Sequence, residues 1–435
     1  MNISLNTEHV LISDERIEKI SAFVREYINH CVSVVDGGGY DEDEASLNCA
    51  SDMRIQQDVA DMVNKKASSK LRYIVVCGIG GSNLGTKAIY EAIIGTVDPY
   101  SAVRPKVLFV DTVSAHLMMD VAELLKDAVS DPEQILINVV TKSGGTAETI
   151  SNIETLNHAL STHMGDITDR IVVSTNEGSK LWDAAGDAGI DRLAIPEKVG
   201  GRFSVFSAVG QFPLRAAGLD VDAVLKGALD MRDRCLSSSD NPALTSAAVT
   251  FAHREIGIRI NNTFVFNPEL ESVGKWYRQL MGESTGKRET RDGVEVREGI
   301  TPIVSVGSTD LHSMAQLYFG GPQDKLTTFV YAKQLPTQVK VPSELLFPNL
   351  VKDIQGKSYK KIMAAIFGGV KKAYEKNDQP YMEIDMPEIN EYTIGQYLQF
   401  KMCEMMYLGK LLNVNPFNQP SVEDYKSETR VLLSS

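Results

Sequence analysis

The sequence lacks the features of a secreted, disulfide-bonded or membrane-spanning protein. Its cysteines are odd in number and scattered, with no pair at CxxC spacing: Cys31, Cys49, Cys77, Cys235 and Cys403. Residues 1–16 carry three acidic residues and no apolar run, and no stretch of eighteen apolar residues occurs. We therefore expect reduced thiols in a cytoplasmic protein without a secretory leader or a membrane span.

An excess of positive charge is also missing. Acidic residues outnumber basic ones by 57 to 44, and the formal net charge is −13. A uniformly acidic chain is a poor binder of nucleic acid and of anionic membranes, so neither is expected as a partner. No HExxH motif and no paired His/Cys motif occurs among the seven histidines, so we expect no metal and no cofactor. An anionic ligand would require cations placed locally at its site.

The remaining composition is that of an ordinary globular protein. Apolar residues make up 43% of the 435 residues and charged residues 23%. A chain of this length exceeds one ordinary core, and two domains of roughly 200 residues each are expected.

Short apolar segments alternate with helical patterns from residue 71 onward. The strands expected in the first half are 73–77, 107–110, 135–140, 171–174 and 193–195. Those expected in the second half are 263–266, 303–305, 326–331 and 381–385, with helices at 206–217, 221–235, 243–258 and 393–412. Strands that alternate with helices predict an α/β fold with parallel, doubly wound sheets. We place the boundary between the two halves near residues 205–215.

Two expected strands end in glycine-rich turns that suit a phosphate. The first turn is Gly78-Ile79-Gly80-Gly81-Ser82-Asn83-Leu84-Gly85, where Ser82 is placed to cap the next helix. The second, Thr141 to Glu148, combines hydroxyl groups with the ammonium of Lys142. Free amides at a helix start attract an anion, and ligands of open α/β sheets bind at the carboxyl ends of the strands. We therefore expect a phosphate monoester at these two turns.

Four further segments carry side chains suited to acid–base chemistry. Arg202 follows a pair of glycines, and Glu283 follows a helix expected to end at Gly282. His312 comes after a strand, in a segment that opens a helix, and Lys426 lies in a polar loop after the apolar helix. Taken singly, each has an ordinary interpretation: such a glutamate is usually solvated, and such a histidine usually lies at the surface.

Together, these segments resemble the glucose-6-phosphate isomerase family, also called the phosphoglucose isomerase family. The matching segments are GIGGSNLG, KSGGTAE, VGGRFS, GESTGK, STDLHSMAQ and NPFNQPSVEDYK, in family order over residues 70–430 or so. The length is similar to that of the shorter bacterial members. The resemblance implies a homodimer in which each chain has two sugar-isomerase (SIS-type) domains, 40–208 and 1–39 with 209–435. It also implies that the active site is completed by the neighbouring subunit's histidine.

The resemblance also implies an activity and a role for each residue. The substrates are glucose 6-phosphate and fructose 6-phosphate, in glycolysis and gluconeogenesis. Glu283 would move a proton between C1 and C2, Arg202 would lie beside the enediolate, and His312 and Lys426 would act in ring opening. The residues that bind the substrate and its phosphate would be Gly81, Ser82, Thr141, Lys142, Ser143, Thr146, Gln279 and Gln419.

These residue types fit the chemistry. A closed sugar ring opens when a proton moves between two oxygens, and histidine titrates near neutrality. A carboxylate then transfers the carbon-bound proton, and a fixed guanidinium stabilises the charge that develops on oxygen. Two positions depart from the family near the phosphate: Thr141 replaces a more usual serine, and Gly145 stands where many relatives have threonine. A third, Thr285, replaces a frequent acidic residue.

Other functions would need only some of these residues. A non-catalytic sugar-phosphate sensor could keep the hydroxyl-rich turns but would not need Glu283, Arg202, His312 and Lys426. A nicotinamide dehydrogenase is disfavoured because Asn83 stands at the third glycine of its fingerprint. An isomerase that also accepts mannose 6-phosphate stays open at this point.

Overall fold

The computed structural model describes residues 2–95, 105–334, 339–348 and 350–434. Its first five-stranded sheet has the order β3-β2-β4-β5-β6, and every neighbouring pair is parallel. The strands are β2 (Tyr73–Cys77), β3 (Lys106–Val110), β4 (Ile135–Val140), β5 (Ile171–Thr175) and β6 (Asp191–Ala194). All five expected strands of the first half are therefore confirmed, with small differences at their ends.

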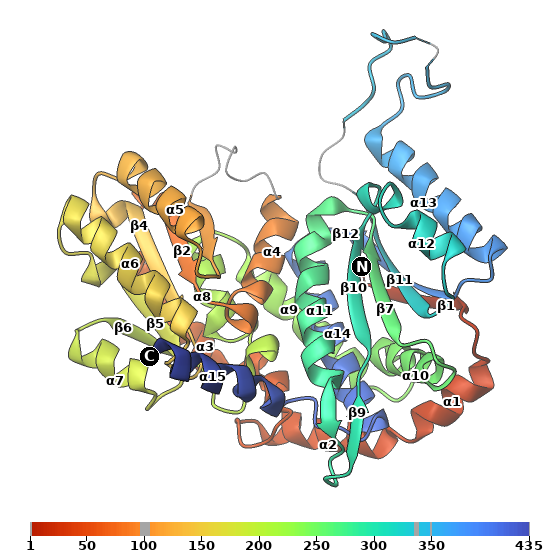
Figure 1. The fold of residues 1–435 in the computed structure, drawn as a ribbon, viewed down its shortest axis with the longest axis horizontal. Helices are drawn as coiled ribbons and strands as arrows, with labels where there is room; N and C mark the ends of the chain where they lie inside the picture. Colours follow the sequence, from red (N-terminus) through yellow and green to blue (C-terminus); the bar gives the residue numbers. More distant parts are fainter. Residues whose placement is uncertain (1, 96–104, 335–338, 349, 435) are drawn as a thin grey trace.

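Helices cover both faces of this sheet, as a doubly wound arrangement requires. Side chains of α5 (Ala115–Ala128) and α6 (Ala147–Met164) join one core cluster with alternate strand residues, such as Val75 and Ile137. The other alternate residues, such as Ile74 and Leu136, join a cluster that includes α4 (Leu84–Ile94), α3 (Met53–Lys66) and α8 (Ala208–Ala216). Successive side chains of a strand point to opposite faces of the sheet, so each face packs against its own layer of helices. Figure 1 shows the two layers on opposite sides of β2 and β4.

The second sheet has the order β1-β12-β11-β7-β10. Its parallel strands are β7 (Ile260–Val265), β10 (Thr301–Val306), β11 (Lys325–Gln334) and β12 (Tyr381–Glu388), all near the expected positions. The edge strand β1 (Ser4–His9) runs antiparallel, and a separate hairpin joins β8 (Lys287–Glu289) to β9 (Glu295–Glu298). Neither feature was expected, because these short strands are rich in polar and charged residues.

Long helices lie between and around the sheets. The central one is α14 (Glu391–Leu411), which is buried along nearly its whole length and packs on α9 (Val221–Cys235), α10 (Pro242–Glu255) and α11 (Glu271–Thr285). Inside it, Lys401 Nζ lies 2.9 Å from Glu404 Oε2, and Glu404 also accepts hydrogen bonds from Tyr277 of α11 and Ser246 of α10. Through these two hydrogen bonds Glu404 joins α14 to α11 and α10.

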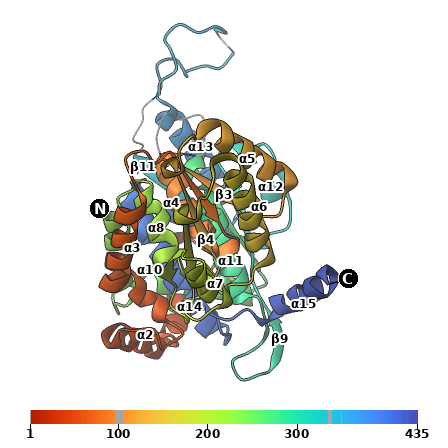
Figure 2. The same cartoon turned by 90° about the vertical axis from the view of Figure 1, so that its left-hand side faces the viewer.

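The remaining helices lie on the outside. The N-terminal helices are α1 (Asp14–Ala22), which packs on α10, and α2 (Arg25–Gly37). α7 (Lys180–Asp187) packs beside β5 and β6, and α12 (Ala315–Gly320) and α13 (Tyr359–Lys376) lie beside the second sheet. The last helix, α15 (Glu423–Leu433), projects from the body at the C-terminal end (Figure 2). In the described part of the chain, no helix combines the length and apolarity needed to cross a membrane.

Candidate active site

The two glycine-rich turns follow neighbouring strands. β2 pairs with β4, and a Cβ atom added at Gly78 would lie 3.0 Å from the carbonyl oxygen of Val140, the last residue of β4. The first turn thus packs on the end of β4. Ser82 belongs to a 3-10 turn, Gly80–Ser82, and does not cap α4: Asn83 is the N-cap, without a side-chain cap bond. The expected capping role of Ser82 is therefore wrong, because the extra 3-10 turn delays the helix by one residue.

The second turn carries hydroxyl groups and an ammonium close together. Thr141 Oγ1 and Thr146 Oγ1 share a hydrogen bond of 2.8 Å, and Ser143 is exposed. Burial lowers the pKa of Lys142, whereas the charge of Glu197 opposes this shift. The turn therefore combines a partly desolvated cation with hydroxyl groups at the start of α6, which suits an anionic group.

The first turn packs directly on the turn that carries Arg202. A Cβ atom at Gly81 would lie 2.1 Å from the carbonyl carbon of Gly201, so only a glycine fits at this contact. Arg202 belongs to a 3-10 turn, Gly201–Phe203, and is 2% exposed. Gly201, the second glycine of the pair before Arg202, makes this close backbone approach to the other turn.

The Arg202 guanidinium connects two distant segments. Nε donates to Ser284 Oγ at 3.0 Å, and one terminal nitrogen donates to Glu283 Oε2 at 3.1 Å and to Gln419 Oε1 at 2.6 Å. The other terminal nitrogen donates to the carbonyl oxygens of Pro416 and, at 3.1 Å, Asn418. A buried guanidinium with all its nitrogens paired is rigidly placed, as a stabilising charge must be.

Glu283 lies in the last turn of α11. The helix does not end at Gly282, as expected, but continues to Thr285, where Gly286 N–H donates to the Gly282 carbonyl at 2.9 Å. One turn earlier, Gln279 Nε2 donates to Glu283 Oε1 at 3.1 Å. The Glu283 side chain remains 31% exposed. Its two oxygens are therefore oriented by Arg202 and Gln279, yet it can still be reached by a small molecule.

Gln279 also links this carboxylate to the first glycine-rich turn. A Cβ atom at Gly80, whose φ is +59°, would lie 2.9 Å from Gln279 Nε2. The fold thus brings Gly81, Arg202, Glu283, Gln279 and Gln419 together from four segments of the chain.

Two expected catalytic residues do not join this cluster within one chain. His312 is exposed after the turn Thr309–Leu311, and no described side chain hydrogen-bonds to its ring. Lys426 lies on α15, where its ammonium is 2.8 Å from Glu423 Oε1.

Lys287 is a site residue that the sequence did not single out. It is 7% exposed, and its ammonium donates to the backbone carbonyls of Glu283 and, at 2.9 Å, Asn418. Its position four residues after Glu283, within GESTGK, was the available signal. Burial lowers its pKa to about 7, the charge of Arg202 adds to this shift, and Glu283 opposes it.

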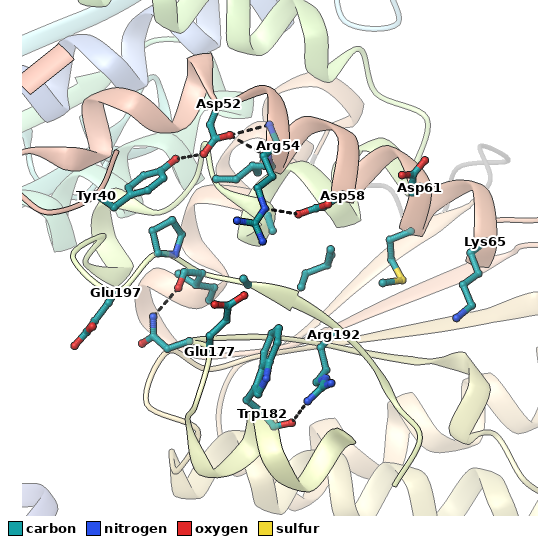
Figure 3. Close-up of a pocket in the computed structure, with 18 residues that line it drawn as sticks. Tyr40, Asp52, Arg54, Asp58, Asp61, Lys65, Glu177, Trp182, Arg192 and Glu197 are labelled. Atoms are coloured by element: carbon teal, nitrogen blue, oxygen red, sulfur yellow. Dashed lines mark hydrogen bonds and ion pairs between the residues drawn. The ribbon is translucent and has the colours of Figure 1, made fainter. Parts of the chain in front are cut away.

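A separate cleft of about 750 Å³ opens between α3 and the β6–α7 edge of the first sheet (Figure 3). Arg54 and Asp58 line it from α3, and Trp182 and Arg192 line it from the opposite side. None of the expected site residues lines this cleft, so its size does not mark the chemistry. The described residues also include one group that could hold a metal ion, His30, Glu42 and Glu44, but Tyr27 already hydrogen-bonds to Glu44.

Known proteins resemble this chain in sequence over most of its length. The family model for phosphoglucose isomerase matches residues 41–434. A glucose-6-phosphate isomerase from Carboxydothermus hydrogenoformans is 34% identical over 87% of this chain and 82% of its own length. One from Clostridium tetani is 30% identical over 100% of this chain and 96% of its own length.

Solved structures show the same fold. A hypothetical protein from Thermus thermophilus has a TM-score of 0.88 at 28% identity, with 100% of both chains covered. A glucose-6-phosphate isomerase from Chlamydia trachomatis has a TM-score of 0.84 at 21% identity, with 100% of this chain and 88% of the other covered. With the family match over nearly the whole length, these similarities show that the chain belongs to the phosphoglucose isomerase family.

Proposed function

We propose that this chain interconverts glucose 6-phosphate and fructose 6-phosphate, an aldose–ketose isomerisation of glycolysis and gluconeogenesis. The observation that carries the proposal is the Glu283 carboxylate, oriented by Arg202 and Gln279 next to a glycine-rich turn. A proton acceptor and a fixed cation are the two groups that proton transfer beside a carbonyl requires.

In this mechanism, Glu283 takes the proton from C2 of the open-chain aldose and returns it to C1. The electrons of the broken C–H bond form the C1–C2 double bond of the enediolate, and those of the carbonyl move to O1, where the Arg202 guanidinium stabilises the charge. A proton then moves from O2 to O1, so that protonation at C1 leaves the ketone carbonyl at C2. The phosphate is held by Gly81, Ser82, Thr141, Lys142, Ser143 and Thr146, and Gln279 and Gln419 contact the sugar. No step requires a metal or a cofactor.

Ring opening precedes this step and is assigned to His312 and Lys426. The exposure of His312 supports a role toward a second copy of the chain, so we propose a homodimer in which each subunit's histidine reaches the neighbour's Glu283. Five buried, unpaired cysteines support a cytoplasmic location, where thiols stay reduced.

The activity is tested by a coupled assay with fructose 6-phosphate and, separately, mannose 6-phosphate.

The role of Glu283 is tested by the variant Glu283→Gln, which keeps the size of the side chain but removes its basicity. We expect this variant to bind fructose 6-phosphate and to lose exchange of the C1 proton with solvent. Exchange that persists in Glu283→Gln would show that another group moves the carbon-bound proton.

The dimeric site is tested by subunit mixing. Inactive Glu283→Gln and inactive His312→Ala chains are dissociated, mixed and reassociated, and hybrid dimers should regain up to one intact site. Full activity in a species that light scattering identifies as a monomer would exclude a shared site.

A further inference from the structure

Lys287 occupies an unusual position for a lysine. It begins β8 directly after Gly286, the C-cap of α11, and its side chain is almost completely buried. The carbonyl of Glu283 is one of the last four of the helix, which have no partner within it. The Lys287 ammonium supplies that partner, and a cation is favoured at this end of a helix.

The same ammonium also holds the loop 415–419. It donates to the Asn418 carbonyl at 2.9 Å, and this carbonyl also accepts from Arg202 at 3.1 Å. Two buried cations therefore share one backbone oxygen, Lys287 from the end of α11 and Arg202 from the neighbouring turn. Gln419, the next residue, is thereby held where its side chain accepts from Arg202.

The charged groups around Lys287 come from three elements. Arg202 repels it from the Gly201–Phe203 turn, and Glu283 attracts it from α11. Glu298, its partner across the β8–β9 hairpin, is already paired with Arg254 and Arg259. No carboxylate of the described residues forms an ion pair with Lys287, and its side-chain hydrogen bonds go to backbone oxygens. The side chain is thus placed to hold backbone segments rather than to neutralise an acid.

We propose that Lys287 is a positioning residue of the isomerase, an inference that rests on the proposed function. Its ammonium fastens the loop 415–419 to the end of α11, so that Gln419 and Glu283 are both held on Arg202. The residue acts through these groups and through the backbone, without touching the substrate.

This arrangement makes positioning depend on pH. Because burial and Arg202 lower the pKa of Lys287 to about 7, the free enzyme loses this charge near neutrality. The charged form holds the helix end and the Asn418 carbonyl more strongly, since a charge-assisted hydrogen bond is roughly twice as strong as a neutral one. Activity should therefore fall as pH rises through this range, and kcat/KM reports the titration of the free enzyme.

The test compares Lys287→Met and Lys287→Arg with the control Arg288→Met. Arg288 is the exposed neighbour, so the control removes one positive charge without disturbing the loop. For fructose 6-phosphate, we expect Lys287→Met to lower kcat/KM by about 10–100-fold, because small displacements at a catalytic group have effects of this size. Lys287→Arg should restore most of the activity and move the alkaline limb of the pH profile upward by at least about one unit, since arginine stays charged. Arg288→Met should stay within about twofold of the wild type.

Each result decides the proposal. It is overturned if Lys287→Met keeps activity within about threefold of the wild type. It is also overturned if the alkaline limb is unmoved in Lys287→Arg, which a purely structural role would predict. If Lys287→Met does not fold, the test uses Lys287→Gln, which keeps a neutral N–H donor. If neither variant folds, Lys287 is required for folding and the proposal is overturned. An inactive wild type would instead refute the proposed function.

Discussion

Replacement of Gly81 by alanine would force apart the two turns on which the site is built. The added Cβ atom would lie 2.1 Å from the Gly201 carbonyl carbon and 2.5 Å from the Arg202 backbone nitrogen. Favourable contacts between carbon atoms lie at about 3.5–4.0 Å, so the turns must separate by more than about 1 Å. Both partners are backbone atoms, and no side-chain rotation can relieve the overlap.

The size of the effect follows from what Arg202 holds. Its side chain is hydrogen-bonded to Ser284, to Glu283 and to the loop 415–419, which includes Gln419. A shift of the Arg202 backbone therefore misaligns both its guanidinium and the Glu283 carboxylate. A displacement of about 1 Å costs on the order of 10²-fold in rate, and overpacking costs about 1–3 kcal/mol in stability. We therefore expect Gly81→Ala to lose about 100-fold in kcat/KM while it still folds.

The assay measures isomerisation of fructose 6-phosphate alongside thermal unfolding. Gly145→Ala is the matched control, because a Cβ atom there meets no atom within 4 Å although it lies in the other glycine-rich turn. The control should stay within about threefold of the wild type, since it only fills open space. Nearly normal activity in Gly81→Ala would refute the view that this backbone contact sets the position of Arg202.

Three further predictions concern the surroundings of the site. Gly145→Thr adds a hydroxyl group in open space at the second glycine-rich turn, where we propose that the phosphate binds. It should lower KM for fructose 6-phosphate by about threefold or more. An unchanged KM would mean that the phosphate binds elsewhere. Ser284→Ala leaves the buried Arg202 Nε without its acceptor and should cost about 1–3 kcal/mol in unfolding free energy, measured with urea; no loss would show that another acceptor replaces the hydroxyl. For Glu298, burial raises the pKa, but hydrogen bonds from Arg254 and Gly299 outweigh it and the net pKa is lowered. The stabilisation is therefore present above the unfolded pKa of about 4.3 and is lost as pH falls through the folded value. The Tm deficit of Glu298→Gln should be largest near neutral pH and shrink in acid, and a deficit independent of pH would contradict this.

Local patterns in the sequence were sufficient for most of the secondary structure. Strand β2 and helix α9 begin and end where the apolar pattern predicted. A parallel strand buried on both faces is a short continuous apolar run, and a helix with one apolar face repeats its apolar residues every three to four positions. Strands β1, β8 and β9 escaped prediction because their exposed, charged residues carry no such period. The glycine-rich turns were recognisable because glycine is required locally, where the backbone turns sharply or approaches another segment closely.

The arrangement around Glu283 depended on the tertiary structure. Arg202 and Gln419 are 217 residues apart in the chain yet hydrogen-bonded, and no local pattern encodes such a pairing. The family resemblance named both residues but did not indicate that Arg202 would be buried among backbone carbonyls, nor that Lys287 would share one of them. The sequence by itself therefore determined the parallel strands of the two sheets, the two glycine-rich turns and the candidate acid–base groups. The tertiary structure decided which of these groups are desolvated and paired, because burial and charge are properties of neighbours brought together by folding.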